Sequence, residues 1–417
     1  MDEKSLKPQL RFKGFTDAWE QRKFKNTIQI ERGGSPRPIE NYITNSENGL
    51  NWIKIGDAPS MGKYITKTAE KIKPEGLSKT REVHPGDLIL SNSMSFGRPY
   101  IMAINGCIHD GWLLLRNDKN LYNLQFLCHL LGNENMLQQY KSFAAGSTVN
   151  NLNKELVGST SVSFPKKDEQ GKLGAFFDSI DNLITLHQRK LDKLSNVKKA
   201  LLEKMFPKND SDVPEIRFKG FTDAWEQRKL SKIATMHARI GWQNLRKSEF
   251  LDSGDYYLIT GTDFDDGKID LKNCHYVAKE RYEQDKNIQV KNGSILITKD
   301  GTLGKVAYVS NLQKPATLNA GVFNVELLTE DTDRKYLFQY LKAPFLMSYV
   351  SQKATGGTIK HLNQNILVDF PVIRPKKIEQ QKIGTFFSNL DNLITLHQRK
   401  LEKLKNIKKA CLEKMFV

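Results

Sequence analysis

The sequence is poor in the features that stabilise secreted domains or cross membranes. Its four cysteines lie far apart and form no CxxC pair, so neither a disulfide framework nor a zinc site is expected; they are Cys107, Cys128, Cys274 and Cys411. No apolar run approaches the roughly 20 residues of a membrane helix. The opening segment MDEKSLKPQL lacks the apolar core of a signal peptide. We therefore expect a cytoplasmic protein that makes no use of a membrane.

Catalytic motifs are missing as well. GTLGK at residues 301–305 has the wrong spacing for a phosphate-binding loop, and the chain has no GxGxxG, no Asn-Pro-Pro-aromatic segment and no HExxH. Residues 165–172 (PKKDEQGK) loosely resemble a nuclease site, but the second copy at residues 375–382 (PKKIEQQK) loses the acidic pair, and we interpret the segment as a solvated hinge. The sequence predicts binding surfaces, with no catalytic residue, metal or cofactor of its own; an enzyme of unrecognised fold is the weaker alternative.

The charge, in contrast, is strongly one-sided. Lys and Arg number 64 against 47 Asp and Glu, which gives a formal net charge of +17 over 417 residues. Such an excess favours a polyanionic partner, namely DNA, RNA or an anionic membrane surface, and we favour a nucleic acid. The simpler explanation is a protein kept soluble by its charge.

Two segments occur twice. RFKGFTDAWEQRK at residues 11–23 returns unchanged at residues 217–229. Residues 174–206 return as residues 384–416, with 8 mismatches in 33 positions and therefore 25 identities. A spacing this long exceeds the 20–50 residues of solenoid repeats and indicates two tandem copies of a whole domain plus a helix. Because the residues between the repeats differ almost completely, one scaffold carries two different surfaces.

The second repeat has the apolar spacing of a coiled coil. Its seam positions step by 4 and 3 residues in both copies, interrupted in each by a histidine and a lysine. The seam residues are Ile180, Ile184, His187, Leu191, Leu194, Lys198, Leu201 and Met205, then Leu390, Ile394, His397, Leu401, Leu404, Lys408, Cys411 and Met415. A single such helix could pack on its own domain, but two matching stripes favour an antiparallel pair. We interpret the two histidines as residues that set the register rather than as metal ligands.

The blocks between the helices mix strand and helix signals. Residues 51–55, 87–91 and 112–115 read as strands and residues 122–140 as helical; in the second block, residues 256–259, 294–298 and 322–327 read as strands and residues 336–350 as helical. We predict an α+β fold with a pseudo-twofold duplication. Its parts are a first variable domain at residues 1–165, a helix at 166–207, a second variable domain at 208–373 and a second helix at 374–417.

This combination resembles the specificity subunit of a Type I restriction–modification enzyme. The resemblance is carried by the WEQRKL-like segments at residues 19–24 and 225–230 and by DNLITLHQRKL at residues 181–191 and 391–401. IERGGSPRP at residues 30–38, followed by NWIKIGD, is similar to the start of a target-recognition domain; the second block lacks a clear equivalent after Met236. The resemblance covers nearly the whole chain.

The resemblance implies a division of labour. Each block would be a target-recognition domain that reads one half of a split, asymmetric site in double-stranded DNA, and the paired helices would set the spacer. The helices would dock two methylation subunits, which bring S-adenosylmethionine, while restriction subunits bring ATP and Mg-dependent cleavage. The chain itself would catalyse nothing. The alternative is a stand-alone, two-headed architectural or regulatory DNA-binding protein.

Candidate base readers lie in three polar, Gly-rich loops of each block, because bidentate donors and acceptors read base edges in the major groove. The loops are residues 32–37, 91–98 and 146–151 in the first block and residues 239–246, 298–305 and 353–361 in the second. In the first block they are Arg32, Arg37, Asn92, Ser93, Arg98, Ser147, Thr148, Asn150 and Asn151. In the second block they are Arg239, Gln243, Asn244, Arg246, Lys299, Thr302, Lys305, Thr358, Lys360 and His361. Trp19 and Trp225 are identical in both copies, so we expect them to be core or docking residues rather than base-stacking ones.

Overall fold

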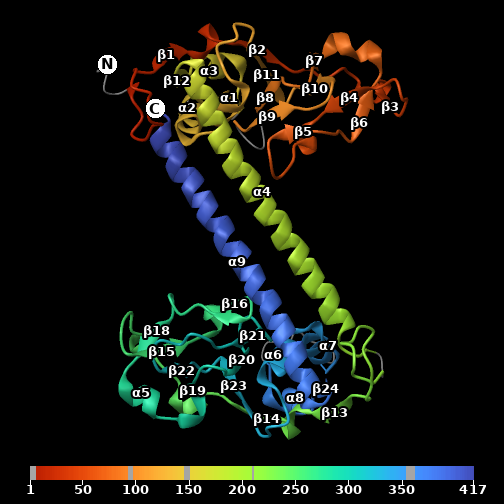
Figure 1. The fold of residues 1–417 in the computed structure, drawn as a ribbon, viewed down its shortest axis with the longest axis vertical. Coiled ribbons are helices and arrows are strands. Elements are labelled where there is room, and N and C mark those ends of the chain that lie inside the picture. The colour runs from red at the N-terminus through yellow and green to blue at the C-terminus, as the bar shows by residue number, and fades with distance from the viewer. Residues whose placement is uncertain (1–5, 93–96, 145–150, 209–210, 354–361) are drawn as a thin grey trace. The chain divides into compact units, whose positions relative to one another are not determined.

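The computed structural model describes residues 6–92, 97–144, 151–208, 211–353 and 362–417 (Figure 1). The chain divides into two compact units: unit 1 comprises Met1–Leu191 with His397–Val417, and unit 2 comprises Asp192–Leu396. Each unit therefore contains one variable block and part of both long helices, α4 (Lys167–Lys204) and α9 (Lys377–Met415). The mixture of sheets and helices in both units confirms the predicted α+β class.

Unit 1 contains a five-stranded sheet of order β2-β11-β8-β9-β5, another of order β3-β6-β4-β10-β7, and the pair β1-β12. The strands are β1 (Glu20–Lys23), β2 (Gln29–Arg32), β3 (Ile43–Thr44), β4 (Leu50–Ile53), β5 (Tyr64–Ile65), β6 (Glu70–Ile72), β7 (Arg81–Val83), β8 (Leu88–Ser91), β9 (Pro99–Met102), β10 (Gly106–Ile108), β11 (Trp112–Arg116) and β12 (Ser161–Phe164). The short helices are α1 (Leu124–Leu131), α2 (Glu134–Ala144) and α3 (Lys154–Ser159). The three strands and the helical stretch predicted for this block are all present, although Ile55 belongs to a 3-10 turn rather than to a strand.

The central strands of unit 1 are apolar on both faces, and this explains why they read as short continuous runs. Leu88 and Leu90 of β8 pack into the cluster that contains Phe126 and Phe177, whereas Ile89 between them packs into a second cluster around Trp112. Because successive side chains of a strand point to opposite faces, this alternation places the sheet between two cores.

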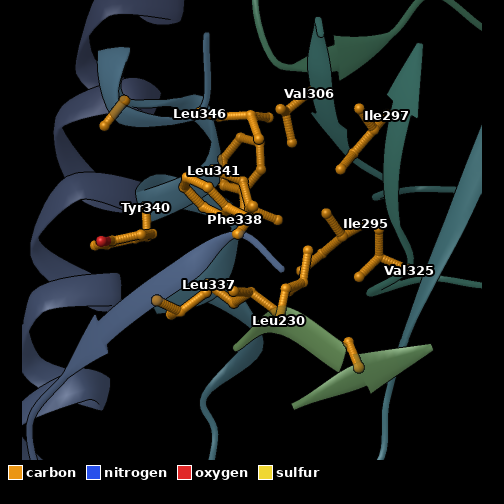
Figure 2. Packing of buried hydrophobic residues seen from close by; sticks show 14 of the residues in the cluster. Leu230, Ile295, Ile297, Val306, Val325, Leu337, Phe338, Tyr340, Leu341 and Leu346 are labelled. Carbon is orange, nitrogen blue, oxygen red and sulfur yellow. The ribbon is translucent and has the colours of Figure 1, made fainter. Parts of the chain in front are cut away.

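Unit 2 has a related arrangement with four strands in each main sheet, β14-β23-β20-β21 and β18-β15-β22-β19, and with the pairs β13-β24 and β16-β17. The strands are β13 (Glu226–Lys229), β14 (Ala234–His237), β15 (Tyr256–Ile259), β16 (Phe264–Asp265), β17 (Lys268–Ile269), β18 (His275–Val277), β19 (Gln289–Val290), β20 (Ile295–Thr298), β21 (Val306–Tyr308), β22 (Ala316–Leu318), β23 (Val322–Leu327) and β24 (Pro371–Arg374). The short helices are α5 (Lys279–Glu283), α6 (Arg334–Lys342), α7 (Pro344–Lys353) and α8 (Gln364–Val368). Figure 2 shows Ile295 and Ile297 of β20 and Val325 of β23 facing Leu337 and Phe338 of α6 across the core of this unit.

The two long helices run antiparallel where they meet inside each unit. In unit 1, Asp181 of α4 pairs with Lys408 of α9 at 2.6 Å, while His187, further along α4, contacts the earlier residue His397 at 2.8 Å between their Nδ1 atoms. In unit 2, Lys198 pairs with Asp391 at 2.5 Å. All predicted seam positions are buried or half-buried; they are Ile180, Ile184, His187, Leu191, Leu194, Lys198, Leu201, Met205, Leu390, Ile394, His397, Leu401, Leu404, Lys408, Cys411 and Met415. The predicted coiled-coil pairing is confirmed.

The C-terminal end of each long helix completes one core. Helix α9 follows the second block in sequence but ends in the core of unit 1, and α4 follows the first block but ends in the core of unit 2. Phe416, just after α9, stacks on Phe126 of unit 1 with ring centroids 5.5 Å apart, and the ring of Trp19 lies 6.0 Å away. Phe206, just after α4, takes the same place in unit 2 beside Trp225, at 6.3 Å. The two tryptophans are therefore core residues, as predicted from their identity in both copies.

The first repeated segment is tied to the start of each long helix by an arginine. Arg11 donates to both carboxylate oxygens of Glu169 at 2.7 Å, and Arg217 does the same to Glu379 at 2.8 Å. Glu169 is 2% exposed. The prediction of a solvated hinge at residues 165–172 was therefore wrong, because these residues begin α4 and bury a paired carboxylate.

Candidate nucleic-acid interface

Sheet topology brings the starts of the first two predicted loops of unit 1 to a single edge. Strand β11 lies between β2 and β8 and is antiparallel to both, so Arg32 at the end of β2 and Ser91 at the end of β8 flank its first residues (Figure 1). The turn at residues 109–111, immediately before β11, lies at the same edge. We call this turn, with the segments that it binds, the loop hub of unit 1.

Backbone hydrogen bonds hold the loop hub together. The amide of Gly34 donates to Ile108 at 3.2 Å, and the amide of Asn92 donates to Gly111 at 3.0 Å. The amide of Leu152, just after the third candidate loop, donates to the carbonyl of Asn92 at 3.0 Å. Gly34, Asn92 and Leu152, the described residues within or beside the three candidate loops, therefore converge on one place.

The local sequence explains the close approach of the first loop. A Cβ atom built on Gly33 would lie 2.2 Å from the carbonyl oxygen of His109, and one on Gly34 would lie 2.3 Å from that of Lys79. Backbone atoms cannot yield by that amount, so only glycine fits at either position. The Gly-Gly pair thus lets the chain lie flat against the hub turn.

Unit 2 has an equivalent hub at residues 319–321, before β23. The amide of Lys299 donates to Gly321 at 2.9 Å, and the amide of Leu362 donates to the carbonyl of Lys299 at 2.8 Å. Here a side chain replaces the Gly-Gly contact: Arg239 donates from Nε to the carbonyl oxygen of Leu318 at 2.9 Å. The two units share the same framework and differ in the residues that it carries.

The predicted readers of unit 1 fall into three groups. Arg32, Arg37, Arg98 and Asn151 are exposed at the hub or on the loops beside it. Asn92 is 4% exposed, and its Nδ2 donates to the carbonyl oxygen of Asp110 at 2.8 Å, which favours a structural role. Ser93, Ser147, Thr148 and Asn150 lie outside the described residues.

The readers of unit 2 divide in the same way. Asn244, Arg246, Thr302 and Lys305 are exposed, and Lys299 is half-buried with its ammonium 5.6 Å from the ring centre of Phe323. Thr358, Lys360 and His361 lie outside the described residues. Base reading by individual residues stays a prediction.

Arg239 and Gln243 of unit 2 are buried, with exposures of 2% and 4%. Besides its bond to Leu318, Arg239 donates to the hydroxyl of Thr317 at 3.2 Å and to Oε1 of Gln284 at 3.2 Å. A guanidinium with its donors engaged in this way holds the first loop in place, so burial favours a positioning role for Arg239.

Sequence reasoning missed Asp110 and His109 in the hub of unit 1. The carbonyl oxygen of Asp110 accepts from Asn92 and, at 3.4 Å, from Nε of Arg32. Burial lowers the pKa of His109, and the positive charges of Arg37 and Lys54 lower it further, while Asp110 raises it. The only sequence signal was their position: His109 lies one residue and Asp110 two residues after the apolar strand β10.

The outer surfaces of the long helices carry a second candidate binding feature. Six aliphatic side chains are exposed by 39–47% and form three pairs related by the repeat: Leu183 with Leu393, Leu186 with Leu396, and Val197 with Ile407. Leu183, Leu186 and Ile407 belong to unit 1, and the other three belong to unit 2. Each unit therefore presents an equivalent exposed aliphatic set on its helices. In the described part of the chain, no helix combines the length and apolarity needed to cross a membrane.

Comparison with known proteins gives consistent matches. The family model of the Type I restriction modification DNA specificity domain matches residues 16–196 and residues 222–406. The putative Type I restriction enzyme MjaX specificity subunit of Methanocaldococcus jannaschii is 23% identical over 94% of this chain and 91% of its own length. The MjaVIII specificity subunit of the same organism is 22% identical, and that match spans 64% of each protein. In fold, the crystal structure of a Type I S subunit from M. genitalium superposes with a TM-score of 0.62 at 16% identity, covering 99% of both chains.

Proposed function

The chain belongs to the Type I restriction modification DNA specificity family, and from that premise we propose that each of its units reads one half of a split DNA site. The observation that carries the proposal is the repeated hub: two units with matching central strand orders and two equivalent backbone bonds at the hub differ in the residues of their loops. Sequence is read by side chains at base edges, so a conserved framework with different loops suits two different half-sites. The net charge of +17 supplies the attraction to phosphate.

The helices supply the docking surface for the methylation subunits in this proposal. Leu183 directly precedes the seam residue Ile184, and Ile407 directly precedes Lys408, so in an antiparallel pair both lie on the same flank. Asp181 pairs with Lys408, which places the two aliphatic side chains at about the same level of unit 1. Leu393 and Val197 are their repeat partners in unit 2. Two equivalent aliphatic faces fit two copies of one partner.

The chain would catalyse nothing in such a complex. S-adenosylmethionine would be held by the methylation subunits, and ATP and Mg²⁺ by restriction subunits. This assignment is supported by the family role and by the sequence, which lacks the phosphate-binding and amino-methyltransferase motifs. The paired helices would set the spacer between the half-sites.

A duplicated-block variant tests the reading role. Residues 24–163 are replaced by residues 230–369, and the variant is co-expressed with its methylation subunit in a host that lacks other adenine methylation. Single-molecule mapping of N6-methyladenine should give a split motif for the native chain and a palindromic one, built from the second half-site twice, for the variant. A variant motif that still contains the first half-site would contradict the proposal. A native chain that forms no complex and yields no motif would favour the stand-alone DNA-binding alternative.

Docking is tested separately with Leu183→Lys combined with Leu393→Lys. Because both side chains are 44–47% exposed, the substitutions should leave the fold intact and reduce co-purification of the methylation subunit by at least about tenfold. Asn182→Lys, at the neighbouring exposed position, is the matched control and should bind normally. Equal binding by all three proteins would remove this face from the interface.

A further inference from the structure

Asp110 is an acidic side chain in the turn at the centre of the loop hub of unit 1. Its Oδ1 accepts from the hydroxyl of Ser35 at 3.0 Å and lies 2.9 Å from Nδ1 of His109, which itself accepts from the amide of Gly111 at 3.0 Å. Among the described residues no hydrogen bond reaches Oδ2, and the side chain is 35% exposed. One carboxylate oxygen is therefore anchored while the other remains available.

The surroundings make this carboxylate unusual. Arg32 donates to the carbonyl oxygen of the same residue, and the positive charge of Arg37 acts on the adjacent His109. A carboxylate close to phosphates is repelled by them, so on a DNA-binding face it weakens binding to every sequence alike. A contact that only some sequences provide would offset this repulsion at the loop hub.

A carboxylate supplies that selectivity because it only accepts hydrogen bonds. In the major groove, cytosine N4 and adenine N6 donate, whereas guanine O6 and N7 and thymine O4 accept. Acidic side chains consequently attract the first two groups and repel the others. Selection would arise from both effects, since the wrong base leaves two acceptors face to face.

We propose that Asp110 selects, at one position of the half-site read by unit 1, a base that presents an exocyclic amino group in the major groove, cytosine or adenine. The inference rests on the proposed function and names one of its specificity-determining residues. The equivalent turn position in unit 2 is Ala320, so the selection belongs to one half of the site only.

The competing explanation is that Asp110 merely shapes the turn through Ser35 and His109. The two explanations differ in what they change. A shaping role, when lost, lowers stability or the overall extent of methylation at an unchanged motif. A reading role, when lost, changes which base is accepted at one position.

The test maps N6-methyladenine for complexes of the full chain carrying Asp110→Asn or Asp110→Ala. Discrimination at one position of the first half-site should fall by on the order of 10-fold to 100-fold, with the second half-site unchanged. The base accepted by the native chain at that position, cytosine or adenine, distinguishes the two donors. Asp118→Asn removes the same charge just beyond the other end of β11 and should leave every position unchanged.

Ser35→Ala separates reading from shaping, because it removes the anchoring bond and keeps the carboxylate. It should retain the native motif. The assignment is overturned if Asp110→Asn and Asp110→Ala keep full discrimination at every position, or if Ser35→Ala relaxes the same position as they do. A native complex that methylates no split motif overturns the proposed function and this assignment with it.

Discussion

The position of Phe416 makes a quantitative prediction about where the stability of unit 1 resides. The ring is 4% exposed, stacks on Phe126 at 5.5 Å, and lies 5.6 Å from Phe177 and 6.0 Å from Trp19. Phe416→Ala removes all three contacts and leaves a cavity among aromatic rings. Core substitutions of this type cost about 3–5 kcal/mol, and we expect the lower end because the site is close to the end of the helix and can partly collapse.

A loss of about 3 kcal/mol is a large part of the 5–15 kcal/mol that stabilises a typical domain. For a unit of this size it corresponds to a fall in melting temperature of roughly 6–12 °C. Calorimetry measures the fall, and amide hydrogen exchange shows which unit opens. Unit 1 should lose protection around Phe126 while unit 2 keeps its own.

Phe206→Ala is the matched variant, because Phe206 is 1% exposed and stacks on Phe387 of unit 2 at 6.0 Å. It should open unit 2 and spare unit 1. A loss below about 1 kcal/mol for Phe416→Ala, or loss of protection in the same unit for both variants, would refute the assignment of each helix end to its core.

Two further predictions concern charged groups beside the helices. His129 is 6% exposed, and burial lowers its pKa although Asp178, 2.7 Å away, raises it. The unfolded chain takes up the proton near pH 6.5 and the folded chain only at lower pH, so this residue makes unit 1 less stable as pH falls from about 6.5 through the folded pKa. His129→Gln, which copies Gln339 of unit 2, should flatten that decline in urea midpoints measured between pH 7 and pH 5.5; an unchanged slope would contradict it. Asp391→Ala should lower the free energy of unfolding by about 3–5 kcal/mol, because it leaves Lys198 buried without its partner. Asp181→Ala should lower it by only about 1 kcal/mol, because Lys408 is 25% exposed. Equal losses of unfolding free energy in urea denaturation would show that burial does not set the difference.

The features that were predictable from sequence are those set by local spacing. The alternation of 4 and 3 residues identifies the seam of α4 and α9 because side-chain direction in a helix depends only on position along it. Identity between copies was equally informative for Trp19 and Trp225, since residues that read different sequences should differ. The candidate loops were found because Gly and polar residues interrupt apolar strands.

The features that were missed depend on partners distant in sequence. Glu169 reads as a solvated acid until Arg11, 158 positions earlier, is placed beside it. Arg239 has the residue type of a phosphate or guanine contact, and only its burial against β22 indicates a positioning role. Asp110 sits between two short strands, and its central place follows from the antiparallel order β2-β11-β8, which no local pattern encodes.

The matching helix ends have a consequence for how such a protein changes over generations. Each block meets its framework through residues that are the same in both copies, among them the Arg11–Glu169 and Arg217–Glu379 pairs and the two phenylalanines that close the cores. Recombination within the repeated segments would therefore exchange one block as a cassette and preserve each of these contacts. A lineage could acquire a new target in a single genetic event, without first passing through an unstable intermediate.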